Sequence, residues 1–545
     1  MKLTKIKKFI GISFLVLFIG STIAFKSDFF EIAKQLEIYT TLFKELNMYY
    51  IDEINPAELN EIAMKSMLKN LDPYTNFYDE QGIEDVRIKR SGEYGGIGAY
   101  TRYKDKRLYI LEPYKNAPAA KAGLHAGDEI LEIDDIIIKE YEGENISSML
   151  RGTPRTKVKL KILRQAKEQI IHVNRSKIEV NPVPFYSMVD REVGYIALVK
   201  FNKKSSKEVK KAIYDLKENG MKKLIIDVRG NPGGLLNEAV SITNMFIPKD
   251  KVVVTTKSKV KKWSNTYKTN NDPLDLEIPL VILIDGQSAS ASEIVSGSLQ
   301  DYDRAVIMGE RSFGKGLVQR YRKLVYGTQM KLTISKYYTP SGRCIQELDY
   351  TNREKDDIPK FSDGQVQTFQ TTNGREVTDG GGVLPDITFD KPETLKLTKE
   401  LYGSDAFFNF VTDYYYAHKT IDDAHQFQLN KEVYDSFVAY VLAHNTDFKT
   451  HSEKVFGEAF KEADKDGYGS KIKEEYKLFL DAVAQEKVLQ LDINKEEIKE
   501  RLTEEIVKRY YYKEGVYEQK LAFDPIIVEA TELLHNEKRY FKTLK

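Results

Sequence analysis

The chain has 545 residues, which is too long for a single hydrophobic core and indicates several domains. Hydrophobic residues make up 41% and charged residues 30%, a composition typical of globular rather than disordered protein. The 83 basic and 82 acidic residues nearly cancel, which argues against a nucleic-acid-binding surface, and the single cysteine, Cys344, excludes an internal disulfide or a CxxC metal site.

The N-terminus has the pattern of an export signal. Four lysines within the first eight residues precede an apolar run over residues 9–25. A basic segment followed by such a run is typical of a secretory signal, and this run is close to the length that a membrane-spanning helix needs. A cleaved signal peptide and an uncleaved anchor over residues 1–26 therefore both stay open. In either case we predict that the body of the protein is exported, to the periplasm or cell envelope.

Residues 27–86 are predicted to form an N-terminal helical cap. Apolar residues between Leu36 and Tyr50 recur at helical spacing, and a second apolar stretch follows from Leu59. This second helix should end before Pro73, because proline disfavours helix at the residue that precedes it. The segment contains no motif that carries chemistry.

Residues 87–175 change to short predicted strands with glycine turns. The run GEYGGIGAY comes first, followed by PAAKAGLHAGDEILEID and MLRGTPRTKVKLKILR. Clustered glycines let successive N–H groups point into one space, and such a nest captures a carboxylate. The three runs in this order resemble a PDZ domain, with GGIG at that family's carboxylate-binding loop. The candidate tail-binding residues are Gly95, Gly96, Ile97 and Gly98.

Residues 183–390 alternate between predicted strands and helices, which indicates an α/β layer architecture. Residues 206–219 form an amphipathic helix, with Ser205 or Ser206 available as the N-cap. Three short apolar runs suit buried strands. These runs are Leu224–Asp227, Leu280–Ile284 and Ala305–Met308.

Residues 391–545 are rich in charged and aromatic residues and are predicted to form a helical region. The run DKDGYGSKIKEE, residues 464–475, places acidic residues and a glycine at several positions of an EF-hand calcium loop. However, Tyr468 and Lys471 stand where such a loop has an Asp or Asn and an apolar residue. A helix–helix turn is therefore the preferred interpretation.

Ser290, in the run SASASEI, is the candidate nucleophile. It follows a predicted buried strand and opens a predicted helix, so its hydroxyl should lie beside the unpaired N–H groups of a helix N-terminus. The N–H of Ala291 is one expected donor to an oxyanion. The second is expected from Gly233 or Gly234, in the glycine-rich run DVRGNPGG.

Lys315, in the run SFGKG, is the candidate base. No histidine lies between His172 and His418, so a histidine base would have to fold back from a distant segment. A lysine can act as a base only when desolvation lowers its pKa, and Gln319 is placed to orient the amine. The same segment reads G-x-x-x-x-G-K, but a glycine follows where a P-loop needs Ser or Thr, so nucleotide binding is disfavoured.

The runs GGIG, DVRGNPGG, SASASEI, FGKG and DGGGVLPDI together resemble the C-terminal processing, or tail-specific, proteases over about residues 36–390. The resemblance implies a crotonase-like (ClpP/crotonase-type) α/β protease core after the PDZ domain. It implies that Ser290 is the nucleophile, Lys315 the general base and Gln319 the residue that orients the lysine. Arg151, in the run LRG, is similar to an arginine that in some relatives links a peptide-loaded PDZ domain to the active site.

The predicted function is therefore an exported serine endopeptidase that binds apolar C-terminal tails of proteins and cleaves through an acyl-enzyme. We expect no metal, no other cofactor and no nucleic-acid partner. A non-catalytic PDZ adaptor on a protease fold is the alternative. A membrane anchor, a homo-oligomer and an adaptor interaction through the helical termini stay open, and residues 391–545 have no assigned role.

Overall fold

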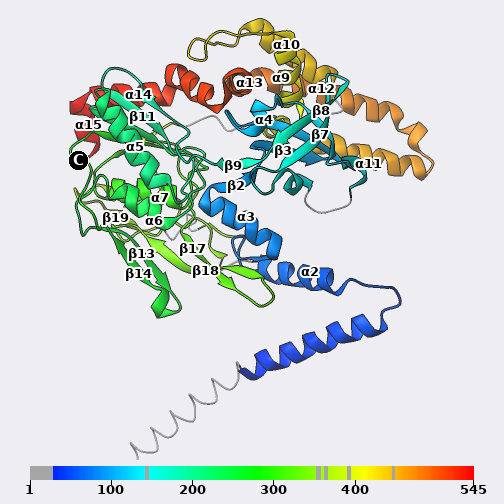
Figure 1. The fold of residues 1–545 in the computed structure, drawn as a ribbon, viewed down its shortest axis with the longest axis horizontal. Coiled ribbons are helices and arrows are strands. Elements are labelled where there is room, and N and C mark those ends of the chain that lie inside the picture. Colours follow the sequence, from blue (N-terminus) through cyan, green and yellow to red (C-terminus); the bar gives the residue numbers. More distant parts are fainter. Residues whose placement is uncertain (1–28, 142–145, 351–357, 361–365, 390–394, 445–448) are drawn as a thin grey trace, which may run out of the picture. The chain divides into compact units, whose positions relative to one another are not determined.

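A computed structural model of the protein describes residues 29–141, 146–350, 358–360, 366–389, 395–444 and 449–545 (Figure 1). The predicted export signal lies outside these ranges. The chain divides into two compact units, residues 1–78 with 321–332 and residues 79–320 with 333–545. Among the helices in the described ranges, none is long and apolar enough to cross a membrane.

The smaller unit contains the helices that the N-terminal apolar spacing predicts. Residues 29–49 are helical, and α2 (Pro56–Lys69) follows. Asn55 caps α2, since its side chain accepts hydrogen bonds from two backbone N–H groups of the first turn. A short strand, β1 (Asn76–Tyr78), was not expected; it pairs antiparallel with β18 (Gln329–Tyr338) over residues 329–331.

The larger unit begins with α3 (Glu80–Ser91), and an antiparallel sheet follows in the order β3-β4-β5-β7-β8, with β6 attached to β5. Alternate residues along β7 are fully buried, which gives this sheet one core face. A separate ladder joins β2 to β9. The bounds are β2 (Glu93–Gly96), β3 (Ala99–Lys104), β4 (Arg107–Pro113), α4 (Pro118–Lys121), β5 (Glu129–Ile133), β6 (Ile136–Ile137), the 3₁₀ helices η1 (Ile138–Glu140) and η2 (Ile146–Leu150), β7 (Lys157–Arg164), β8 (Lys167–Asn174) and β9 (Ser176–Glu179).

A six-stranded sheet in the order β10-β11-β12-β15-β16-β21 forms the centre of the larger unit. Only the β10–β11 pair is antiparallel; the other pairs are parallel. The three predicted buried strands are confirmed as β12, β15 and β16. The bounds are β10 (Phe185–Met188), β11 (Val193–Ala197), α5 (Ser205–Glu218), β12 (Lys223–Asp227), α6 (Leu236–Thr243), β15 (Leu280–Ile284), α7 (Ala291–Asp301), β16 (Val306–Gly309) and β21 (Ile387–Thr388).

The central strands are buried on both faces, as parallel strands usually are. One face packs against α5, α6 and α7. The other face packs against α14 (Pro525–His535) and α15 (Glu537–Thr543), which Figure 1 shows in red beside β11. The C-terminal helices therefore complete the core of the central sheet, which the sequence did not predict.

The predicted cap of α5 is wrong. The helix begins at Ser205, and its N-cap residue is Lys204. The Ser205 hydroxyl instead accepts a hydrogen bond from the N–H of Asn202 and donates one to the carbonyl of Lys200. Ser205 thus closes the loop that precedes the helix.

Further strands and helices complete the larger unit. The strand β13 pairs with β14 and with the end of β18. Within the run 464–475, residues 466–472 connect α11 to α12. The predicted C-terminal helices are present. The remaining bounds are β13 (Val252–Ser258), the 3₁₀ helix η3 (Lys261–Trp263), β14 (Asn265–Lys268), β17 (Leu317–Lys323), β19 (Thr368–Gln370), β20 (Glu376–Thr378), α8 (Lys396–Gly403), α9 (Ala406–Ala417), α10 (Lys431–Ala443), α11 (His451–Lys465), the 3₁₀ helix η5 (Gly469–Lys471), α12 (Lys473–Ile493) and α13 (Lys495–Phe523).

Candidate active site

Ser290 is the N-cap residue of α7, at the end of the loop that follows β15. Its φ of 57° and ψ of −107° are rarely adopted by residues other than glycine. Its N–H donates to Glu293 Oε2 at 2.6 Å, and its carbonyl accepts from the N–H of Ile294 at 2.9 Å and the hydroxyl of Tyr337 at 3.1 Å. The surroundings thus hold the strained backbone of Ser290 on both sides.

A single buried carboxylate, that of Glu293, joins the segments that carry Ser290 and Lys315. Besides the Ser290 N–H, Oε2 accepts from the N–H of Lys315 at 3.0 Å. Oε1 accepts from the Ser312 hydroxyl at 2.6 Å and from the N–H of Gly314 at 2.7 Å. Burial raises the pKa of Glu293 to about 7, although these four donors favour its charged form.

The sequence reasoning missed Glu293. One signal was present: an acidic residue three positions after a serine at a helix start is the pattern of a capping box. Here the carboxylate accepts not only from the N-cap N–H but also from a second loop.

Lys315 lies half-buried just before β17, in a tightly packed turn. The next residue, Gly316, donates its N–H to Gln346 Oε1 at 2.8 Å and accepts at its carbonyl from the N–H of Tyr337 at 2.9 Å. A Cβ on Gly316 would stand 2.7 Å from the backbone nitrogen of Gln346, so this turn needs glycine. Tyr337 therefore contacts both loops, through its hydroxyl at Ser290 and its backbone at Gly316.

The neighbours of Lys315 are mixed in character. Leu317 is buried, whereas Phe313 is 44% exposed. Gln319, on β17, donates its side-chain N–H to Thr333 Oγ1 at 3.3 Å. Gln319 thus lies on the strand that Lys315 precedes, and its amide nitrogen donates a hydrogen bond to the neighbouring strand β18.

The NPGG loop packs directly against Ser290 and its two neighbours in the chain. A Cβ on Gly233 would stand 2.5 Å from the carbonyl oxygen of Ala289 and 2.8 Å from the backbone nitrogen of Ala291. The N–H of Gly233 is used, since it donates to Asn231 Oδ1 at 2.9 Å. By contrast, the N–H groups of Gly234 and Ala291 have no hydrogen-bond partner within the part of the chain that the structure describes.

An ion pair connects the start of the same loop to the C-terminal region. Arg229 binds Asp227 Oδ2 at 2.6 Å and Asp524 Oδ2 at 2.8 Å, while Asp227 also accepts from the Tyr195 hydroxyl at 2.8 Å. Burial pushes the pKa of Asp227 upward, but the Arg229 guanidinium outweighs it and holds this pKa below its usual range. Asp524 is also the N-cap of α14, so α14 is tied to the loop that reaches Ser290.

The GGIG run is divided between a strand and a turn. Gly95 and Gly96 belong to β2 and pair with β9. The carbonyls of Ile97 and Gly98 accept from backbone N–H groups at the start of α4 and in the loop before it, and Gly98 has a φ of 73°. The N–H groups of these two residues have no hydrogen-bond partner among the described residues.

Arg151 lies beside this turn. Its backbone forms a bridge with Gly96, and its guanidinium pairs with Asp85 of α3 and stands 6.0 Å from the centroid of the Tyr94 ring. The structure thus places Arg151 next to the candidate carboxylate loop and pairs it with α3, not with a catalytic residue.

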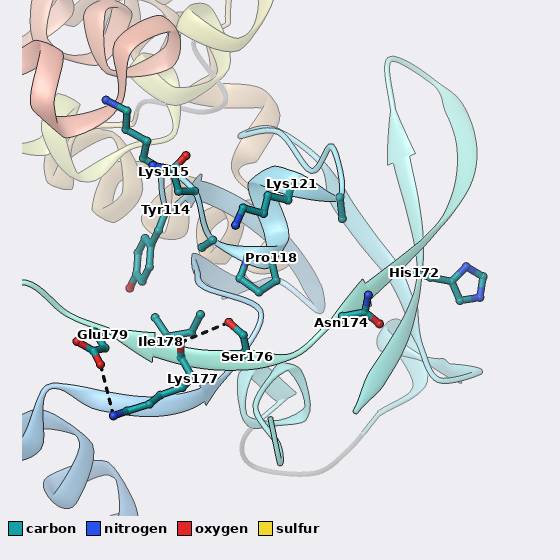
Figure 2. A pocket seen from close by; sticks show the side chains of 13 residues that line it. Tyr114, Lys115, Pro118, Lys121, His172, Asn174, Ser176, Lys177, Ile178 and Glu179 are labelled. Atoms are coloured by element: carbon teal, nitrogen blue, oxygen red, sulfur yellow. Dashed lines mark hydrogen bonds and ion pairs between the residues drawn. The ribbon is translucent and has the colours of Figure 1, made fainter. Parts of the chain in front are cut away.

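A pocket of about 760 Å³ lies between the segment around α4 and the strands β8 and β9, and not at Ser290. Figure 2 shows Lys115 and Lys121 on one wall, with Lys177 and Glu179 on the strand opposite. Lys177 and Glu179 form an ion pair at 3.4 Å. No candidate catalytic residue lines this pocket.

Comparison with known proteins gives three matches in chain order. Residues 95–174 match the PDZ domain, residues 192–352 match peptidase family S41, and residues 397–534 match the C-terminal helical domain of probable PDZ-proteases.

Two relatives and one solved structure are also similar to this chain. The carboxy-terminal-processing protease of Bartonella bacilliformis is 35% identical over 329 residues, 58% of this chain and 74% of that protein. A probable CtpA-like serine protease of Staphylococcus haemolyticus is 36% identical over 308 residues, 56% of this chain and 61% of that protein. The solved photosystem II D1 C-terminal processing protease is 25% identical, covering 65% of this chain and 87% of that one, with a TM-score of 0.36.

These sequence matches define a serine-type peptidase that combines a PDZ domain with a family S41 peptidase domain. The chain belongs to the family of carboxy-terminal-processing proteases.

Proposed function

We propose that this peptidase cleaves with a Ser290–Lys315 dyad. The observation that carries the proposal is the Glu293 carboxylate, which accepts a hydrogen bond from the backbone N–H of each of the two residues. One buried group thereby links the backbones of the proposed nucleophile and the proposed base. The absence of histidine between residues 172 and 418 of the sequence favours lysine as the base.

The reaction then follows the acyl-enzyme route. The neutral amine of Lys315 takes the proton of Ser290 Oγ as this oxygen attacks the peptide carbonyl, and the lysine returns the proton to the leaving amine as the C–N bond breaks. Water then attacks the resulting ester and gives a proton to Lys315. As the ester C–O bond breaks, Lys315 returns this proton to Ser290 Oγ, which releases the acid and restores the neutral amine. Gln319 is the proposed orienting residue for the amine.

The oxyanion hole is proposed to consist of the N–H groups of Ala291 and Gly234. Both have no partner among the described residues, whereas the N–H of Gly233 is taken by Asn231. Two backbone donors aimed at the developing negative charge are the usual means of stabilising a tetrahedral intermediate.

The substrate is proposed to be a protein with an exposed apolar C-terminal tail. The free N–H groups of Ile97 and Gly98 suit a terminal carboxylate. The strand β3 follows this turn and, among the described strands, pairs only with β4, so a tail can add to its other edge. Arg151, beside the turn, is the proposed link between tail binding and catalysis.

We also propose that the protease core is crotonase-like and that the body of the protein is exported. The parallel central sheet with helices α5, α6 and α7 on one face supports the first statement. The lysine-rich start and the apolar run of residues 9–25 support the second.

The dyad is tested with purified Ser290→Ala and Lys315→Ala proteins and an unstructured substrate with an apolar tail. Each variant should lose about 10⁴-fold or more in kcat. Lys323→Ala, which removes an exposed lysine of β17, is the matched control and should keep full activity. Wild-type activity in Lys315→Ala would overturn the dyad. A Ser290 that no serine-directed phosphonate labels, combined with tight tail binding, would favour the non-catalytic adaptor.

A further inference from the structure

The two faces of β3 meet different parts of the chain. Thr101 donates its hydroxyl hydrogen to Ser147 of η2 at 3.2 Å. Because side chains alternate along a strand, Tyr100, Arg102 and Lys104 point to the opposite face. All three meet the C-terminal helical region there, so the strand proposed to take the tail lies between η2 and that region.

Asp405, the N-cap residue of α9, binds two of these side chains. Its carboxylate lies 2.7 Å from Arg102 Nη1 and 3.0 Å from Lys104 Nζ. Lys513 of α13 meets the third, with its amine 4.6 Å from the centroid of the Tyr100 ring. Without Asp405, two cations two residues apart on one strand face would repel each other.

Aromatic and steric contacts extend the same interface. The Phe408 ring of α9 lies between the guanidinium of Arg102, at 5.3 Å, and that of Arg509, at 4.6 Å. Gly127 lies against α9 so closely that a Cβ there would stand 2.6 Å from Thr412 Cγ2. We call this contact, between β3 with the Gly127 turn on one side and α9 with α13 on the other, the PDZ–helix seam.

Some buried polar atoms at the PDZ–helix seam do not form hydrogen bonds. Within the described ranges, five of its residues bury side-chain nitrogen or oxygen atoms that have no hydrogen-bond partner: Arg102, His125, Asp405, Tyr416 and Arg509. Burial lowers the pKa of Arg509 to about 10, and two of its three guanidinium nitrogens are among these atoms. An interface with such gaps is held by few favourable contacts, which gives the Asp405 ion pairs a large share of its stability.

We infer that the C-terminal helical region positions β3 for tail binding, and that Asp405 is the positioning residue. The inference rests on the proposed function, since it requires β3 to take the tail. A tail strand gains its backbone hydrogen bonds only if the β3 edge and the Ile97–Gly98 turn hold one fixed geometry. Asp405 fixes that geometry from the face that the tail does not occupy.

The test measures tail binding apart from cleavage, in the Ser290→Ala background. The probe is a fluorescein-labelled decapeptide with an apolar C-terminus and a free carboxylate; the same peptide with a C-terminal amide reports carboxylate-independent binding. Asp405→Asn should raise the Kd of the free-carboxylate peptide about threefold to tenfold. In the active enzyme, the same change should raise KM and leave kcat unchanged.

Three further variants make the result specific. Arg102→Gln, on the other side of the seam, should behave like Asp405→Asn, and Asp405→Glu should keep most of the affinity because it keeps the charge. Asp413→Asn, an exposed aspartate on the same helix, should leave the Kd unchanged.

The outcomes separate two failures. If the parent binds the free-carboxylate peptide and Asp405→Asn binds it equally well, the positioning role is overturned. The same holds if Asp405→Asn and Arg102→Gln lower kcat as much as they raise KM, since a general loss of structure would do that. If the parent itself does not prefer the free carboxylate, the proposed tail recognition fails instead.

Discussion

The catalytic centre and the PDZ–helix seam both join segments that lie far apart in the sequence, but they are built differently. At the catalytic centre, one carboxylate receives four donors within 3.0 Å, and Tyr337 closes the other side. At the seam, several buried polar atoms of the described residues have no partner. We therefore expect the proposed catalytic groups to be fixed in one arrangement, and the proposed tail binding to depend on an interface that small changes can shift.

The largest expected effect follows from Glu293→Gln. Glutamine has nearly the same shape, but its NH₂ group would replace one carboxylate oxygen. That group cannot accept the two hydrogen bonds that the oxygen accepts now. Leaving these buried donors unpaired should lower kcat/KM about 10²- to 10⁴-fold with the fold retained. Glu192→Gln, at a surface ion pair with Lys222, is the control and should be silent. A fully active Glu293→Gln enzyme would contradict the rigid description of the centre.

The next effect concerns Asp524, which ties α14 to the start of the loop that carries Gly233 and Gly234. Asp524→Asn leaves the buried Arg229 with one carboxylate partner instead of two, and should lower the free energy of unfolding by about 3 kcal/mol. Urea denaturation measures this loss. Glu529→Gln, on the same helix and paired with Arg539 near the surface, should cost about 0.5 kcal/mol or less. Equal losses in the two variants would mean that the Asp524 contact is an ordinary surface pair.

The third effect is a pH dependence with opposite signs for activity and stability. Because the pKa of Glu293 is about 7 in the folded chain, its carboxyl is protonated at lower pH and can no longer accept from all four donors. Activity should therefore fall roughly tenfold for each pH unit below about 7.

Stability should change the other way in the same titration. The folded-state pKa lies above the ordinary value of 4.5, so the folded chain binds the proton more tightly than the unfolded chain. The resulting stabilisation is complete below about pH 4.5 and is lost as the pH rises to about 7. Initial rates and urea midpoints across this window measure both trends. The contribution of Glu293 is the difference in urea midpoint between the parent and Glu293→Gln. A contribution that grows with pH would contradict a raised pKa for Glu293.

The smallest effect belongs to the seam. Gly127→Ala places a methyl group where Thr412 now packs and strains a residue with a φ of 100°, so the tail Kd should rise about threefold. Thr412→Ala alone should have little effect. The double variant should recover part of the loss, because it removes the clash but not the backbone strain. No recovery would show that the strain, not the contact with α9, sets the affinity.

Sequence patterns were sufficient where local chemistry decides the structure. The strands β12, β15 and β16 followed from short apolar runs, and Ser290 was expected to open a helix because small polar residues follow a buried strand. The sequence left open whether Gly233 or Gly234 is the second candidate donor, and only the structure distinguishes between them. Whether Gly233 or Gly234 offers its N–H depends on the Asn231 side chain, which competes for one of them.

Long-range partners could not be predicted in this way. The Arg229–Asp524 ion pair joins residues 295 positions apart, and nothing in the run DVRGNPGG indicates that a C-terminal helix completes it. The same applies to Asp405 and β3, whose contact joins residues 301 positions apart. Glu293 is the exception, since its capping-box spacing was visible; its second role at Lys315 was not, because that role depends on how the two loops approach.

The packing of α14 and α15 on the central sheet also sets an order for folding. The backbone of Leu280, in β15, exchanges hydrogen bonds with the hydroxyl of Tyr540, 260 residues later in the chain. Until residues 525–543 arrive, one apolar face of the sheet is uncovered, and the NPGG loop, which packs against Ser290, lacks the ion pair between Arg229 and Asp524. Contacts of such long range form late, so peptidase activity should emerge only after the helical region has been synthesised and docked. We therefore expect that a chain still being made does not cut its neighbours or itself.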